Sequence, residues 1–259
     1  MTAVVLGVLL PFFGTTIGAG SVLFMKRGFG GMTQKILSGF AGGVIVAASV
    51  WSLLIPAIAM AQESGGGRWS FVPAVAGLLA GILFLFLLDR VIPHIYAVGE
   101  VQQEEALKKS AMLLLAVTLH NIPEGMAVGA VFAGMLADNE VVSLMGAFTL
   151  AIGIAIQNFP EGAIISMPVY AAGTGRKKAF IYGALSGAVE PLGAILTIAM
   201  SRYLIPVMPY LLSFAAGAMI YVVVEELIPE AALEEPGSVT TMGFAVGFAL
   251  MMALDVALG

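Results

Sequence analysis

Residues 111–135 read AMLLLAVTLHNIPEGMAVGAVFAGM, and they are the most informative segment for the class of fold. It contains no lysine or arginine, and its one acid, Glu124, lies near the middle. A helix of about 20 apolar residues spans the hydrocarbon core of a bilayer, so the stretch predicts a membrane-spanning helix. Ionisable groups inside a membrane are costly and usually mark a functional site. We therefore expect a functional polar centre at mid-membrane, formed by His120, Asn121 and Glu124.

A second copy of the polar pattern follows in the next apolar stretch. HNIPEG occupies residues 120–125, and QNFPEG occupies residues 157–162, which is 37 residues further on. A short segment separates the two stretches, so their helices are predicted to run in opposite directions. Opposed copies of one motif at mid-membrane are typical of the binding site of inverted-repeat transporters.

The composition of the whole chain agrees with a membrane protein. Apolar residues make up 60% of the sequence and charged residues 10%, and the mean hydropathy is +1.03. A soluble domain carries about 25% charged residues. We predict an all-α integral membrane protein with a single polytopic domain, residues 1–259, and eight transmembrane helices. Their predicted ranges are roughly 4–25, 35–61, 71–93, 111–135, 143–171, 179–201, 207–229 and 240–258.

The basic residues predict how the chain is oriented. Cytoplasmic loops carry an excess of lysine and arginine. With eight helices and the N-terminus outside, nine of the eleven basic residues face the cytoplasm and only Arg68 and Arg202 face out. Both termini are therefore predicted to lie outside a multi-pass cell membrane. The longest cytoplasmic segment, residues 94–110, is predicted to be a solvated, partly disordered linker.

Helix geometry groups the motif side chains. Positions i, i+1 and i+4 share one helix face, and each motif proline leaves a carbonyl without its helical donor. The side chains grouped in this way are His120, Asn121 and Glu124 on one helix, and Gln157, Asn158 and Glu161 on the other.

These groups suit a divalent transition-metal ion. One imidazole, two carboxylates and amide oxygens favour Zn²⁺, Fe²⁺, Mn²⁺ or Cd²⁺, and two carboxylates neutralise one dication. A third intramembrane acid, Glu190, lies within SGAVEP at residues 186–191. Three carboxylates leave a two-metal site, bridged by Glu124 and Glu161, with a net charge of +1; with one metal, protonation of Glu190 would compensate. We predict transport of such ions, zinc before the others, with uptake into the cytoplasm by alternating access through this one- or two-metal site.

Other classes of function are less consistent with the sequence. The chain has no cysteine and two histidines, which excludes thiolate sites and any site of three imidazoles. The protease pattern H-E-x-x-H is absent, so an enzyme is not expected, and no basic patch indicates nucleic acid. A metal-selective ion channel is the main alternative. A metal-binding receptor would need a signalling domain that this sequence does not contain.

The two Pro-Glu-Gly motifs, followed by Ser-Gly-x-x-Glu-Pro at residues 186–191, resemble the ZIP (Zrt/Irt-like) family of metal transporters, and most of all its bacterial GufA-like branch. The resemblance covers nearly the whole chain. It implies eight helices in a 3+2+3 arrangement with an inverted repeat and the two motif helices at the centre. It also implies two metal positions, the first formed by His120, Glu124, Gln157 and Glu161 and the second by Asn121, Glu124, Asn158, Glu161 and Glu190.

The sequence departs from the family pattern in three places. Gln157 stands where many members have histidine, the run Val44–Val46 lacks the methionine of some bacterial relatives, and the histidine-rich cytoplasmic loop is absent. Two further acids, Glu226 and Asp255, are hypotheses for a relay or exit path, whereas Asp89 beside Arg90 is equally consistent with an interfacial ion pair. The small-residue run Gly39–Gly43 allows helix packing within one chain or in a homodimer.

Overall fold

The structure is a computed structural model that describes residues 2–24, 31–96, 102–137, 142–229 and 238–258. Within the helices, the side chains of residues 91–96, 102–113, 116, 120, 171 and 226 lie outside this description. The elements are α1 (Thr2–Phe24), α2 (Gly31–Ala48), α3 (Ile55–Ala61), α4 (Phe71–Tyr96), α5 (Gln102–Leu136), α6 (Leu144–Ala171), α7 (Arg176–Gly187), α8 (Val189–Ala199), α9 (Ser201–Leu204), α10 (Met208–Val222) and α12 (Ser238–Leu258).

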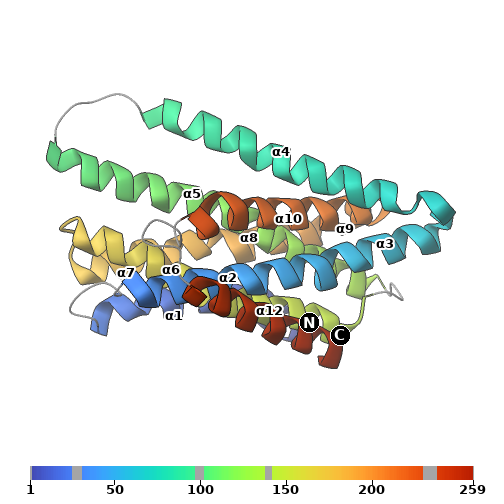
Figure 1. Cartoon of the computed structure of the whole chain (residues 1–259). Helices are drawn as coiled ribbons and strands as arrows, with labels where there is room; N and C mark the ends of the chain where they lie inside the picture. The colour runs from blue at the N-terminus through green and yellow to red at the C-terminus, as the bar shows by residue number, and fades with distance from the viewer. Residues whose placement is uncertain (1, 25–30, 97–101, 138–141, 230–237, 259) are drawn as a thin grey trace.

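The fold is an all-helical membrane bundle, as predicted. Seven helical segments within the described residues are long and apolar enough to cross a bilayer. The 35-residue α5 runs beside them and brings the arrangement to the predicted eight (Figure 1). The two motif helices, α5 and α6, run in opposite directions, and the two termini lie at the same end of the bundle (Figure 1).

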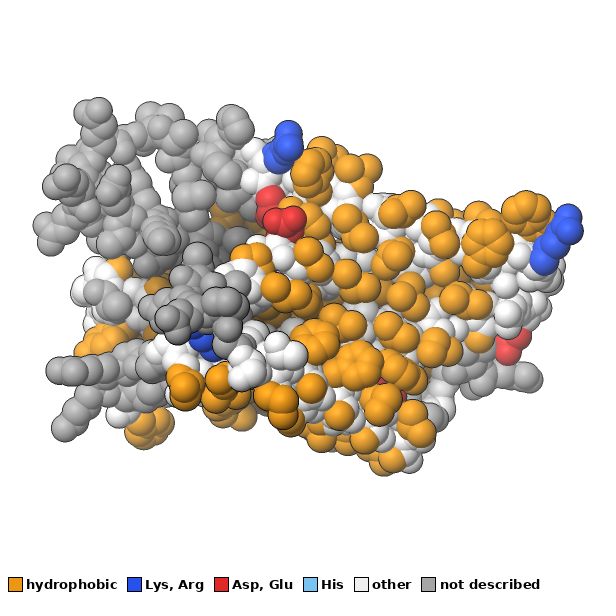
Figure 2. All heavy atoms as spheres, viewed as in Figure 1, with side chains coloured by type: hydrophobic (Ala, Val, Ile, Leu, Met, Phe, Trp, Pro, Cys, Tyr) orange, Lys and Arg blue, Asp and Glu red, His pale blue; other side chains and the backbone are white. Residues whose placement is uncertain are grey.

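The apolar residues face outward as well as inward. Figure 2 shows apolar side chains over the middle of the visible face, with most of the visible charged side chains toward the ends. Large exposed apolar residues such as Leu79, Leu192 and Val256 occur on several helices. A surface of this kind is stable against lipid tails but not against water.

The structure differs from the predicted helices in three places. The second span continues from α2 to α3 through a π-helical stretch, Ser49–Leu54. The sixth span is broken between α7 and α8 at Ala188, next to Glu190. The prediction of a linker over residues 94–110 is partly wrong, because α4 extends to Tyr96 and α5 already begins at Gln102. Good helix formers such as Gln, Glu, Ala, Leu and Lys fill the first turns of α5, so charge alone was a poor guide to its start.

Close backbone contacts through glycine join four helix pairs: α1 with α6, α5 with α8, α2 with α12, and α4 with α10. We call the two pairs that include the motif helices, together with α7, the motif group, and the other two pairs, together with α3, the outer group. Among the described residues, every glycine whose added Cβ would lie within 3 Å of the backbone of another helix joins two helices of one group. Examples are Gly14 of α1, which packs on the Ala155 carbonyl of α6, and Gly43 of α2, which packs on the Phe244 carbonyl of α12. Close backbone packing of this kind holds membrane helices together.

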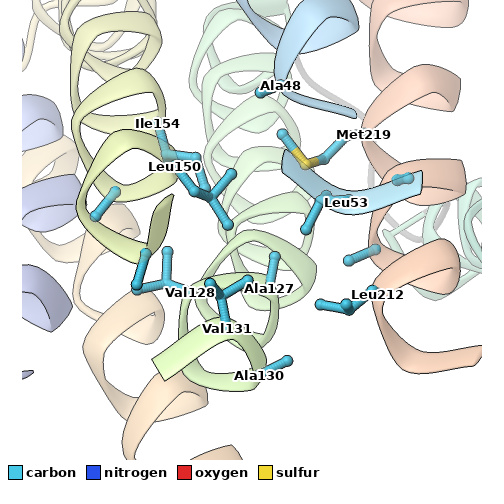
Figure 3. Close-up of a cluster of buried hydrophobic side chains, with 14 of the residues drawn as sticks. Ala48, Leu53, Ala127, Val128, Ala130, Val131, Leu150, Ile154, Leu212 and Met219 are labelled. Atoms are coloured by element: carbon cyan, nitrogen blue, oxygen red, sulfur yellow. The ribbon is translucent and has the colours of Figure 1, made fainter. Parts of the chain in front are cut away.

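The contact between the two groups is made by side chains. Figure 3 shows the buried apolar cluster there: Ala127 and Val131 of α5 and Ile154 of α6 lie toward Leu53 and toward Leu212 of α10. Gly153 of α6 meets the side chain, not the backbone, of Met251 in α12. The four helix pairs are thus each tightly packed, and the two groups meet across an apolar side-chain layer.

The run Gly39–Gly43 packs within the chain. A Cβ on Gly39 would lie 2.3 Å from the Thr240 carbonyl oxygen, and one on Gly43 would lie 2.1 Å from the Phe244 carbonyl oxygen. Of the two arrangements that the sequence left open for this run, the structure therefore shows the one within a single protomer.

Candidate metal site

The two motifs meet through Glu124 of α5 and Gln157 of α6. The Gln157 Nε2 atom donates to both Glu124 carboxylate oxygens, at 2.9 and 2.8 Å, and also to Asn158 Oδ1. All three side chains are buried. Three oxygen atoms from two helices therefore converge on one point, which the amide nitrogen occupies.

Each motif asparagine is held by a backbone carbonyl of a neighbouring helix. Asn121 Nδ2 donates to the Ser186 carbonyl of α7 at 3.1 Å, and Asn158 Nδ2 donates to the Pro11 carbonyl of α1 at 3.5 Å. These bonds use the amide nitrogens and leave the amide oxygens to accept other partners. A cation is one such partner.

The last residue of each motif sets how closely the next helix approaches. A Cβ on Gly125 would lie 2.2 Å from the carbonyl oxygen of Glu190, and one on Gly162 would lie 2.1 Å from the carbonyl oxygen of Thr15. Any side chain at either position would push α8 or α1 away. The two glycines thereby bring Glu190 and Thr15 against the motif helices.

Glu190 is fully buried between these helices. Its Oε1 accepts a hydrogen bond of 2.9 Å from Thr15 Oγ1. Its Oε2, like Asn121 Oδ1, is buried and has no hydrogen-bond partner among the described residues. A buried acceptor without a partner costs about 1–3 kcal/mol, and a bound cation would remove this cost at both atoms.

Two of the predicted ligands are described less completely. The backbone of His120 lies in α5, but its side chain is outside the described residues. Glu161 is half-buried, one helical turn after Gln157 on α6. Within the described side chains, no group of three or more His, Asp or Glu residues is placed to hold a metal. The donor set seen here is instead mixed, with carboxylates and amide oxygens together.

This donor set fits a divalent cation. Glu124 and Glu190 would supply acidic oxygens, Asn121 and Asn158 would supply amide oxygens, and all four side chains are buried. Such a set of groups suits borderline and hard divalent ions. Hydrogen bonds join Glu124, Gln157 and Asn158 of the seven predicted site residues, while Asn121 and Glu190 lie on α5 and α8, which pack on each other beside them.

Thr15 is not among the site residues predicted from the sequence. Thr15 and Thr16 are adjacent in the first apolar stretch, and residue type alone does not mark either as part of a site. A signal did exist, however, because Thr15-x-x-Gly18-Ala19 and Glu190-x-x-Gly193-Ala194 share their glycine and alanine positions.

Asp255 lies apart from this centre. Ser52 Oγ donates to its Oδ1 at 2.6 Å, while its Oδ2 is buried without a partner among the described residues. A cavity of about 140 Å³ opens beside the pair and is also lined by Trp51 and Ser143. The side chain of Glu226 is outside the described residues, and Asp89 is half-buried on α4.

Comparison with known proteins gives one consistent family. Residues 99–255 match the model of the family described as ZIP Zinc transporter. The human zinc transporter ZIP11 is 34% identical, over 98% of this chain and 96% of its own length. The zinc transporter ZIPB of Bordetella bronchiseptica is 36% identical over 98% of this chain and 81% of its own length. The zinc transporter GufA of Myxococcus xanthus is 34% identical over 81% of both chains.

Proposed function

The chain belongs to the ZIP zinc transporter family, and from this premise we propose that it takes up Zn²⁺ into the cytoplasm across the cell membrane. The observation that carries the proposal is the convergence of both Glu124 oxygens and Asn158 Oδ1 on the Gln157 amide nitrogen. A dication at that point would replace the partly positive amide group of Gln157 with a full positive charge. The buried carboxylate of Glu124 favours this replacement.

The proposed ligands are the seven residues of the two motifs and the following helix. His120, Glu124, Gln157 and Glu161 form the first metal position, and Asn121, Asn158 and Glu190 complete the second with the two shared glutamates. For Gln157 to bind through its oxygen, its amide must turn over when the ion arrives. The oxygen-rich set is also open to Fe²⁺, Mn²⁺ and Cd²⁺, because none of its groups is selective by softness.

The two helix groups support alternating access as the mechanism. Backbone contacts through glycine lie inside each group, whereas apolar side chains form the layer between them. Movement of the motif group against the outer group would break no backbone packing. It would carry the site, which belongs wholly to the motif group, between the two sides of the membrane.

The proposed orientation of the protein in the membrane rests on the basic residues. Arg176, Lys177 and Lys178 begin α7 at the end away from the termini, and Arg202 lies in α9 at the end near them (Figure 1). The positive-inside rule then puts the start of α7 in the cytoplasm and both termini outside. With this orientation Asp255, near the end of α12, lies on the outer side. We therefore assign it to the access route and not to the exit.

The test is zinc uptake into proteoliposomes that contain the purified protein. Wild type should give saturable uptake, and Glu161→Ala should lower it at least about tenfold, as the loss of a ligand does. Glu225→Ala, which removes an exposed acid at the end of the seventh span, is the matched control and should transport normally. Zinc binding without any flux would overturn the transport proposal. Flux that does not saturate with zinc concentration and follows the membrane voltage would indicate a channel and not a carrier.

A further inference from the structure

Thr15 and Glu190 occupy equivalent positions in two repeated helix pairs. In one pair, α6 packs on α1, and in the other α5 packs on α8. The motif glycine of each pair touches the carbonyl oxygen of Thr15 or of Glu190. The motif asparagine of each pair donates to the carbonyl of the residue four positions before Thr15 or Glu190, which is Pro11 or Ser186.

A third contact follows the same rule. The glycine three residues after Thr15 lies against the carbonyl of Phe159, and the glycine three residues after Glu190 lies against the carbonyl of Ile122. Phe159 and Ile122 are the third residues of their motifs. Three independent contacts therefore relate Thr15 to Glu190, although one is a neutral alcohol and the other an acid.

The two equivalent residues also meet. Thr15 Oγ1 donates to Glu190 Oε1 at 2.9 Å, and both side chains are essentially inaccessible to solvent. Thr15 lies against the break between α7 and α8 as well, because a Cβ on Gly187 would be 2.8 Å from the Thr15 Cβ. The hydroxyl is thus fixed in space by packing on α7 and has the carboxylate within reach.

The bond uses one carboxylate oxygen and leaves the other. Glu190 Oε2 has no partner among the described residues, so a hydroxyl that holds Oε1 also sets where Oε2 lies. A ligand that is already oriented loses less side-chain entropy on binding. Because the first repeat has the neutral Thr15 where the second has Glu190, the site contains three carboxylates and not four.

We infer that Thr15 is a positioning residue of the zinc site, whose hydroxyl holds one oxygen of Glu190 so that the other is presented to the ion. This inference rests on the proposed function. It predicts that loss of the hydroxyl weakens zinc binding while the fold and the maximal transport rate are retained.

The experiment measures zinc affinity of purified full-length protein by competition with a fluorescent zinc chelator, and the KM and maximal rate of uptake in proteoliposomes. Thr15→Val keeps the shape and removes the hydroxyl, and should raise the Kd and the KM roughly 3- to 10-fold, the effect of one lost hydrogen bond. Thr15→Ser keeps the hydroxyl and should restore affinity. Thr197→Val is the matched control, because the buried Thr197 hydroxyl donates to the Gly193 carbonyl of its own helix at 2.8 Å.

A double-mutant cycle separates positioning from packing. If Thr15 acts through Glu190, Thr15→Val should have no further effect on Kd in a Glu190→Ala background. An equal effect in both backgrounds would overturn the inference, and so would a Thr15→Val protein with wild-type affinity or a Thr15→Ser protein as weak as Thr15→Val. Wild-type protein that binds no zinc would instead overturn the proposed function.

Discussion

The amide nitrogen of Gln157 lies 2.9 and 2.8 Å from the two carboxylate oxygens of Glu124, across the boundary between α6 and α5. One side chain thus satisfies both oxygens of a buried acid. The position that a cation would take is next to a hydrogen-bond donor from the neighbouring motif. This relationship couples the two motif side chains and yields the first prediction.

Gln157→Glu should make zinc binding more sensitive to acid. The substitution puts a second carboxylate about 3 Å from Glu124, and two buried carboxylates at that distance do not both carry charge without a cation. The variant must then release about one more proton than wild type for each zinc bound. Its zinc affinity should therefore fall more steeply as the pH is lowered.

Zinc titrations between about pH 6 and 8 measure this slope. Gln62→Glu, an exposed change just after α3, is the control and should keep the wild-type slope. Equal slopes for Gln157→Glu and wild type would show that the side chain at position 157 does not face Glu124.

The glycine contacts predict a sharp difference between two neighbouring positions of α1. A Cβ on Gly18 would lie 1.9 Å from the Phe159 carbonyl oxygen, whereas one on Gly20 meets its nearest atom at 3.9 Å. Gly18→Ala should destabilise the protein by about 1–3 kcal/mol and lower its uptake, because α1 must move away from α6. Gly20→Ala should be neutral in both respects.

Thermal unfolding of the two purified variants tests this. Similar melting temperatures for Gly18→Ala and Gly20→Ala would contradict the close packing of α1 on α6.

The two-group arrangement predicts which cross-links stop transport. The chain has no native cysteine, so introduced pairs react alone. A disulfide between Gly153→Cys of α6 and Met251→Cys of α12 joins the two groups and should abolish most uptake until it is reduced. A disulfide between Gly134→Cys of α5 and Val142→Cys just before α6, where the Cβ separation would be 3.7 Å, suits disulfide geometry, stays within the motif group and should leave uptake intact.

Uptake with and without a thiol reductant, with the cross-linked fraction determined in the same samples, measures the effect. Full uptake through a fully cross-linked Gly153/Met251 pair would exclude relative movement of the groups at this contact.

Asp255→Asn should affect access of zinc more than its passage. The carboxylate lies beside a cavity at the end of the bundle that we assign to the outside. Removal of its charge lowers the local cation concentration, so the KM should rise roughly 3- to 10-fold, with the maximal rate nearly unchanged. Ser52→Ala, which removes its hydrogen-bond donor and keeps the charge, should have the smaller effect on KM.

Uptake at graded zinc concentrations separates the two parameters. A fall in the maximal rate at constant KM would instead place Asp255 in the rate-limiting movement.

Part of the site was predictable because its signal is local. Positions i, i+1 and i+4 share a helix face whatever surrounds the helix, so the sequence predicted that Asn121 and Glu124 belong together, and likewise Gln157 and Asn158. The membrane fold was equally predictable, since lipid selects apolar stretches of spanning length. The start of α5 at Gln102 was not, because its charged first turns read as a loop as easily as a helix.

The class of fold, the paired motifs and the ligand types follow from residue type and spacing along one helix, so they were predictable. The contact of Thr15 with Glu190, the bridge from Gln157 to Glu124 and the packing of Gly39 and Gly43 within the chain became visible with the packed helices. These contacts join residues far apart in sequence. They depend on how closely two helix backbones approach and at what register, and no single helix encodes that information.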